Sequence, residues 1–120
     1  MAKGDDIEKR TIDFAVQIIN VVKKLPNDFT GKHLSNQLLR SGTSPAAHYA
    51  EARGAESKKD FIHKLKIGLK ELNETKTWLK IIIGANLISH DSLKELLDEC
   101  EQLSRIFNAS IQTTRKSINN

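Results

Sequence analysis

Apolar residues recur at intervals of three and four along almost the whole chain, which is the spacing of amphipathic helices. The pattern is interrupted in three places, at Pro26, around Gly54 and around Asn86, where turns are favoured. It predicts four helices, over residues 6–25, 31–53, 58–85 and 90–118. The composition, with few aromatic residues and apolar residues that are mostly Leu, Ile, Val and Ala, favours helices over a sheet.

Polar residues with capping chemistry precede each predicted helix. Asp5 and Asp6 open the first, Thr30 is the expected cap of the second, and Ser57 is the expected cap of the third. Either Ser89 or Ser92 caps the fourth. Within the second helix, Pro45 removes a backbone donor, so a kink or a short break is expected near residues 42–44.

The inner face of the second predicted helix changes from large to small residues, which predicts a close crossing with a neighbouring helix. Its positions are Leu34, Leu38, Ser41, Pro45, His48 and Ala52. The third helix separates into three sides at about 100° per residue. The core side holds Phe61, Leu65, Gly68, Leu69, Leu72, Leu79 and Ile83; the opposite side holds Lys59, His63, Lys66, Lys70 and Thr77. Between them lie Ile67, Trp78 and Ile82.

These features predict an all-α fold and a single domain over residues 1–120. Short connections force consecutive helices to run in opposite directions, so the expected architecture is an antiparallel up-down-up-down four-helix bundle. The longest apolar run, at residues 81–83, is too short to cross a bilayer, and the start of the chain has no signal-peptide pattern. The one cysteine excludes an internal disulfide framework, so a cytoplasmic protein is expected.

The net charge of +4 is concentrated in the middle of the chain, where residues 23–80 hold twelve Lys or Arg against six Asp or Glu. This favours an anionic partner, although a solvated surface with mild positive charge is the simpler explanation of charge alone.

The central stretch, residues 38–80, resembles the 23S rRNA intervening sequence protein family. The matching residues are Leu38 to Ser44 without a gap, Ala47, Tyr49, Glu51, Ala52, Gly54 to Leu65 without a gap, Lys70, Glu71, Glu74, Thr75, Trp78, Leu79 and Lys80. His48 and Pro45 depart from the pattern, which usually has Asn and an apolar residue there. The resemblance implies a bacterial cytosolic four-helix bundle, a ring-shaped homopentamer and an association with nucleic acid.

The candidate nucleic-acid contacts are basic residues at the start of the third helix and just before it: Arg53, Lys58, Lys59, His63, Lys66 and Lys70. Lysines of this kind contact phosphates and give affinity without base selection. The alternative is a solvated helix face, with Glu71 and Glu74 among the compensating charges. Aromatic platforms for base stacking are lacking.

The candidate oligomer interface consists of apolar residues away from the core stripe: Ile67, Trp78, Ile82 and Leu39. A separate apolar patch that includes Trp usually marks an interface. The alternative is a buried arc broader than one stripe.

No combination of residues predicts catalysis, a cofactor or a metal site. The four histidines are scattered, and Cys100 lies in an apolar stripe, where a buried inert thiol is expected. Arg40 and Glu51 are about 16 Å apart along one helix at 1.5 Å per residue, so each is expected to pair with another helix.

The sequence therefore predicts a non-enzymatic homo-oligomeric bundle that binds structured RNA or DNA through basic helix faces. The alternative is an oligomeric protein-interaction scaffold without affinity for nucleic acid.

Overall fold

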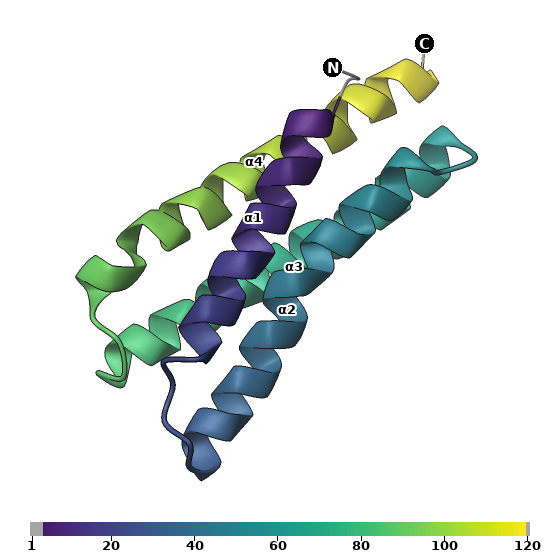
Figure 1. The fold of residues 1–120 in the computed structure, drawn as a ribbon. Coiled ribbons are helices and arrows are strands. Elements are labelled where there is room, and N and C mark those ends of the chain that lie inside the picture. Colours follow the sequence, from purple (N-terminus) through teal and green to yellow (C-terminus); the bar gives the residue numbers. More distant parts are fainter. Residues whose placement is uncertain (1–3, 120) are drawn as a thin grey trace.

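The structure is a computed structural model that describes residues 4–119. It contains four helices, α1 (Asp5–Val22), α2 (Phe29–Arg53), α3 (Lys58–Gly84) and α4 (His90–Asn119), and no strand within the described residues (Figure 1). The all-α prediction with four helices is confirmed. The molecule is 51 Å long and 26 by 23 Å across.

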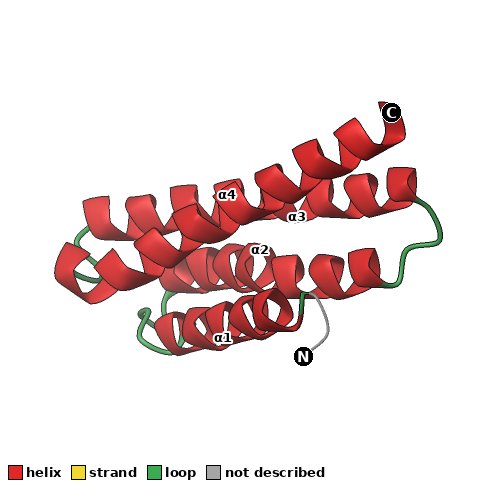
Figure 2. Ribbon diagram, turned by 90° about the horizontal axis from the view of Figure 1, so that it is seen from above, coloured by secondary structure: helices red, strands yellow, loops and turns green. Residues whose placement is uncertain are grey.

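The helices form two layers, with α1 beside α2 and α3 beside α4 (Figure 2). Along the α2–α3 seam, contacts occur in opposite chain order. Arg40 pairs with Glu71 and Glu74, whereas Glu51, further along α2, pairs with Lys64, which is earlier in α3. Short connections therefore return each helix along the one before it, as Figure 1 shows.

At the start of three helices a side chain accepts a hydrogen bond from a backbone N–H group of the first turn, although one of these capping residues differs from the expected one. Asp28, not Thr30, caps α2 by accepting a hydrogen bond from the backbone N–H of Gly31 at 2.8 Å. Ser57 caps α3 as predicted, through the N–H of Asp60. Ser89 accepts from the N–H of Ser92 just before α4. The expected end of the first helix at residue 25 is wrong, since α1 ends at Val22.

The core runs along all four helices and contains mainly Leu, Ile and Phe, including Phe14, Ile18, Leu38, Leu65, Leu72, Leu79, Leu103 and Phe107, each with no exposed surface. On α3 the buried positions are Ile62, Leu65, Gly68, Leu72, Thr75, Leu79 and Ile82. This series replaces the predicted core positions Phe61, Leu69 and Ile83, which are only partly buried. Buried positions spaced alternately by three and four residues have an average repeat of about 3.5 residues. On a straight helix with about 3.6 residues per turn, such positions shift gradually around the helix axis. They stay in the core when the helices wrap around one another.

Helix α2 continues through Pro45, so of the kink or short break expected near residues 42–44 the break does not occur. Pro45 is fully buried, and the preceding turn is held on both sides. Gly42 packs against Ile18 of α1, while the hydroxyl of Ser41 lies 2.9 Å from that of Thr75 on α3. Packing on both sides keeps the helix intact despite the missing backbone donor.

Two glycines allow the helices to approach closely. A Cβ atom at Gly42 would lie 2.6 Å from Cγ1 of Ile18, and one at Gly68 would lie 2.6 Å from Cε2 of Phe107. Both neighbouring side chains are fully buried, so neither has free space to move into. Gly42 was not among the small residues for which a close crossing was predicted, so its close approach to α1 is a finding of the structure.

No helix among the described residues is long and apolar enough to cross a membrane.

Replacing Gly42 with Val should lower the free energy of unfolding by about 1–3 kcal/mol, because added atoms overpack the crossing with α1. The matched change Gly84→Val, at a position where a Cβ atom meets no neighbour within 4 Å, should stay within about 0.5 kcal/mol of the original. Urea unfolding followed by circular dichroism measures both. Equal effects of the two changes would contradict a tight crossing at Gly42.

Candidate nucleic-acid interface

One side of α3 carries four basic residues that point away from the core: Lys59, His63, Lys66 and Lys70. All four are exposed, as the sequence predicted. Within residues 4–119, none of the three lysines forms an ion pair or a side-chain hydrogen bond. We call these four residues the basic face. Its charges remain available to an external anion.

Glu71 and Glu74, the two acidic residues that follow the basic face along α3, are bound elsewhere. Arg40 of α2 donates to Glu71 at 2.8 Å and also to Glu74. On the other side of the face, the Lys64 ammonium lies 3.2 Å from Glu51. The sequence suggested Glu71 and Glu74 as counter-charges for the lysines, but these carboxylates serve Arg40 instead.

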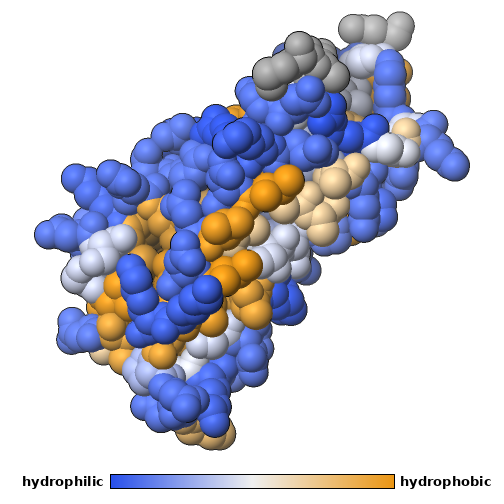
Figure 3. Space-filling model, viewed as in Figure 1, coloured by the Kyte–Doolittle hydropathy of each residue, from blue (hydrophilic) through white to orange (hydrophobic). Residues whose placement is uncertain are grey.

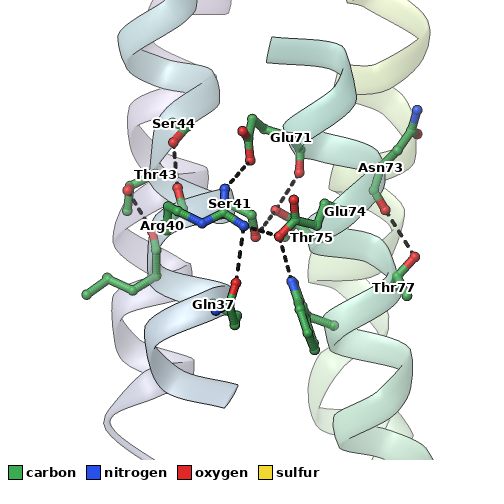
Figure 4. A network of polar contacts seen from close by, with 12 residues as sticks. Gln37, Arg40, Ser41, Thr43, Ser44, Glu71, Asn73, Glu74, Thr75 and Thr77 are labelled. Carbon is green, nitrogen blue, oxygen red and sulfur yellow. Dashed lines mark hydrogen bonds and ion pairs between the residues drawn. The ribbon is translucent and has the colours of Figure 1, made fainter. Parts of the chain in front are cut away.

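Arg40 is the centre of a polar network between α2 and α3 (Figure 4). It donates to Gln37 at 3.3 Å as well as to the two carboxylates, and Trp78 donates through Nε1 to Glu74 at 2.9 Å. Partial burial lowers the pKa of Arg40, but Glu71 and Glu74 raise it by more, so its pKa lies above the ordinary value. Arg40 thus remains charged and links the two helices, which agrees with the prediction that it pairs across helices.

Two of the predicted nucleic-acid contacts have intramolecular partners. Arg53 donates to Asp5 at 2.9 Å, and its guanidinium lies 3.4 Å from Glu8. The hydrogen bond to Asp5 raises the pKa of Arg53, so the group is charged but already neutralised by α1. Arg53 is therefore left out of the proposed nucleic-acid contacts. Lys58 is exposed, and its ammonium contacts the hydroxyl of Ser117 near the end of α4.

The predicted oligomer interface is divided by the fold. Ile82 has no exposed surface and belongs to the core, so its assignment to an interface is wrong. Ile67 and Trp78 are partly buried on the side of α3 that holds Glu71 and Glu74. Leu39 is 39% exposed, but it lies one turn before Gly42, on the side of α2 that faces α1. These residues therefore belong to separate surfaces.

The sequence analysis missed an exposed apolar stripe on α1. Ile12 and Val16 are each 50% exposed, and Ile19 is 38% exposed. Their spacing of four and three was visible in the sequence, where the stronger core stripe at Phe14, Ile18 and Val21 concealed it.

A model of the 23S rRNA-intervening sequence protein family matches residues 4–109 of the chain. The chain belongs to this family. A crystal structure of a protein of unknown function from the S23 ribosomal protein family of Bacteroides thetaiotaomicron is similar to it, with 36% sequence identity and a TM-score of 0.83. That similarity covers 88% of this chain and 97% of the other. Comparison with curated proteins gives no match.

In this member of the family, the described residues contain no group of three or more His, Cys, Asp or Glu that could hold a metal ion. A surface groove of about 480 Å³ lies between α3 and α4, but it holds the Lys76–Glu101 ion pair at 2.9 Å beside further charged residues. Nothing in the groove forms a nucleophile–base pair. His48 lies 3.8 Å from the carboxylate of Glu51, and its Nδ1 has no hydrogen-bond partner within the described residues.

Cys100 is buried in the core, as predicted, and its thiol donates to the carbonyl of Leu72 at 3.2 Å. Burial raises the pKa of this thiol to about 12. The thiolate, which is the reactive form, is therefore nearly absent at neutral pH.

Cys100 should not react with a maleimide at pH 7–8 over the time in which a free thiol is fully labelled. In urea the same residue should react rapidly, because unfolding exposes it and restores its ordinary pKa. Mass spectrometry measures the labelled fraction. Rapid labelling of the folded chain would contradict the buried position of the thiol.

Proposed function

We propose that the chain is the subunit of a non-enzymatic homo-oligomer that binds structured RNA or DNA through the basic face of α3. The observation that carries the proposal is that Lys59, Lys66 and Lys70 form no ion pair within the described residues, while Glu74, one turn after Lys70, is paired with Arg40. A row of cations that are not paired with carboxylates attracts a polyanion.

The spacing of the three lysines suits the backbone of a double helix. From Lys59 to Lys70 the face extends over about 16 Å at 1.5 Å per residue. A duplex presents on the order of nine phosphate charges over that length. No exposed aromatic ring accompanies the lysines, since Trp78 is half-buried and bound to Glu74. Phosphate contact with a folded or duplex nucleic acid is thus favoured over base stacking.

Family membership supports an RNA partner, since the family name refers to sequences that interrupt 23S rRNA and the similar crystal structure is named for a ribosomal protein family. The antiparallel up-down-up-down bundle is also the subunit that the resemblance associates with a ring of five. In such a ring every subunit would repeat the basic face, so several weak phosphate contacts would act together.

Changing Lys59, Lys66 and Lys70 to Glu should abolish binding to duplex RNA and DNA without changing the helical signal. If three phosphates are neutralised per subunit, wild-type affinity should fall about 40-fold between 50 and 200 mM salt. The single change Lys66→Gln should lower the slope of log affinity against log salt by about one. Fluorescence anisotropy with labelled duplexes and single strands measures each value.

The matched control changes Lys32, Lys94 and Lys116 to Glu. These residues are exposed, lie on α2 and α4, and form no ion pair within residues 4–119, so the net charge changes equally. The control should keep most of the affinity. Equal loss in both variants would show that net charge alone drives binding, and unchanged affinity in the first variant would reject the basic face.

A protein-interaction scaffold is the second candidate, favoured by the exposed apolar stripe on α1. Its expected signature is no nucleic-acid binding at low salt together with a copurifying protein that nuclease treatment does not remove.

A further inference from the structure

Exposed residues of α3 form one continuous ridge that runs from the start of the helix almost to its end. They are spaced alternately by four and three residues, so they follow the same repeat as the buried positions and stay on one side of the helix. We call this series the outer ridge: Lys59, His63, Lys66, Lys70, Asn73, Thr77 and Lys80. It continues the basic face beyond Lys70 and is about 32 Å long at 1.5 Å per residue.

The outer ridge differs from the other exposed helix surfaces because it contains no carboxylate. Among the four helices that the structure describes, α3 alone has no exposed acidic side chain. The exposed acids of the other three helices are Asp6, Asp13, Glu51, Asp91, Glu95 and Asp98. The face where α1 lies in front also carries a band of apolar side chains (Figure 3). The outer ridge is therefore the helix surface that suits a polyanion over a long distance.

The cations of the outer ridge are separated by a neutral stretch. The basic face ends at Lys70, and the next exposed cation of α3, Lys80, lies about 15 Å further along the helix at 1.5 Å per residue. Lys76, one turn before Lys80, binds Glu101 of α4 at 2.9 Å, whereas Lys80 forms no ion pair within residues 4–119. An unpaired cation thus lies on each side of the neutral stretch.

The neutral stretch carries two exposed side chains with hydrogen-bonding groups, Asn73 and Thr77. Both lie on the side of α3 that points away from α2 (Figure 4). The Thr77 hydroxyl donates to the backbone carbonyl of Asn73 at 3.3 Å, so its oxygen can still accept a hydrogen bond. The Asn73 side chain has no partner within residues 4–119, and its amide offers donors as well as an acceptor. A ligand hydroxyl, which both donates and accepts, suits this pair.

Hydroxyl groups between two rows of phosphates are a property of duplex RNA. Its minor groove is wide and shallow and displays the 2′-hydroxyls. The minor groove of B-form DNA is only about 6 Å wide, which is much narrower than the neutral stretch. The B-form major groove is about 12 Å wide but about 8.5 Å deep. Side chains as short as Asn73 and Thr77 do not reach base edges at that depth from a ridge that rests on the phosphates.

From these observations we infer that the outer ridge of α3 lies across the minor groove of an RNA duplex. Lys70 and Lys80 contact the phosphates on the two sides of the groove, and Asn73 and Thr77 bind 2′-hydroxyls between them. Duplex RNA is thus the preferred ligand, and duplex DNA binds through the basic face alone. This inference rests on the proposed function and deepens it, because it names the nucleic acid that the site selects.

The first test compares RNA and DNA duplexes of the same sequence and length by fluorescence anisotropy. The wild-type chain should bind RNA on the order of 10-fold more tightly, as two additional hydrogen bonds predict. Changing Asn73 to Ala together with Thr77 to Val should remove this difference by weakening RNA binding while leaving DNA binding unchanged. A duplex of 2′-O-methyl RNA, whose 2′ position cannot donate, should also bind less tightly than RNA.

The second test measures the contact on the far side of the groove. Lys80→Gln should lower the slope of log affinity against log salt by about one for RNA and leave the slope for DNA unchanged. Lys94→Gln, at an exposed position on α4, is the matched control and should leave both slopes unchanged. An unchanged slope for RNA in Lys80→Gln would reject the contact with the second row of phosphates.

A matched control for the polar pair changes Asn108 to Ala and Thr113 to Val, at exposed positions on α4, and should keep the preference for RNA. Circular dichroism checks that each variant is helical. Equal wild-type affinity for RNA and DNA, or a preference that survives the loss of Asn73 and Thr77, would overturn the inference and leave the proposed function intact. Absence of binding to any duplex would reject the proposed function itself, so the two failures are distinguishable.

Discussion

The close approach of α2 to both of its neighbours is the constraint on which the rest of the structure depends. Gly42 lets α1 pack directly on the α2 backbone, and Ser41, one residue earlier, meets Thr75 of α3 through a hydroxyl contact of 2.9 Å. The turn that precedes Pro45 is therefore held by α1 on one side and by α3 on the other, and α2 stays continuous through the proline. A larger residue at Gly42 would separate α1 from α2.

The same α2–α3 seam determines where the charge of the molecule is available. Arg40 can bind Glu71 and Glu74 together because the helices are close at this point. Glu74 lies four residues after Lys70 on the same helix, where it would otherwise compensate this lysine. The network thus affects the surface, because Glu74 is bound to Arg40 and Lys70 of the basic face forms no ion pair within the described residues. Stability and the proposed binding activity share one set of contacts.

The exposed charge and the exposed apolar surface lie on different helices. The basic face lies on α3, whereas the exposed apolar residues Ile12, Val16 and Ile19 lie on α1. In the proposed homo-oligomer each subunit would present its own basic face. Repetition of a weak phosphate site is an economical way for a small bundle without a base-reading element to hold a long polyanion.

The sequence by itself determined the four helices, the cap at Ser57, the family and the exposure of Lys59, Lys66 and Lys70, because helical periodicity and capping are local properties. Only the tertiary structure placed Ile82 in the core, bound Arg53 to Asp5 and Glu8, and assigned Glu71 and Glu74 to Arg40. These outcomes depend on how the helices wrap and on which residues of different helices face one another. A straight periodic pattern contains neither the rotation of a helix about its axis nor the identity of the residue across the seam.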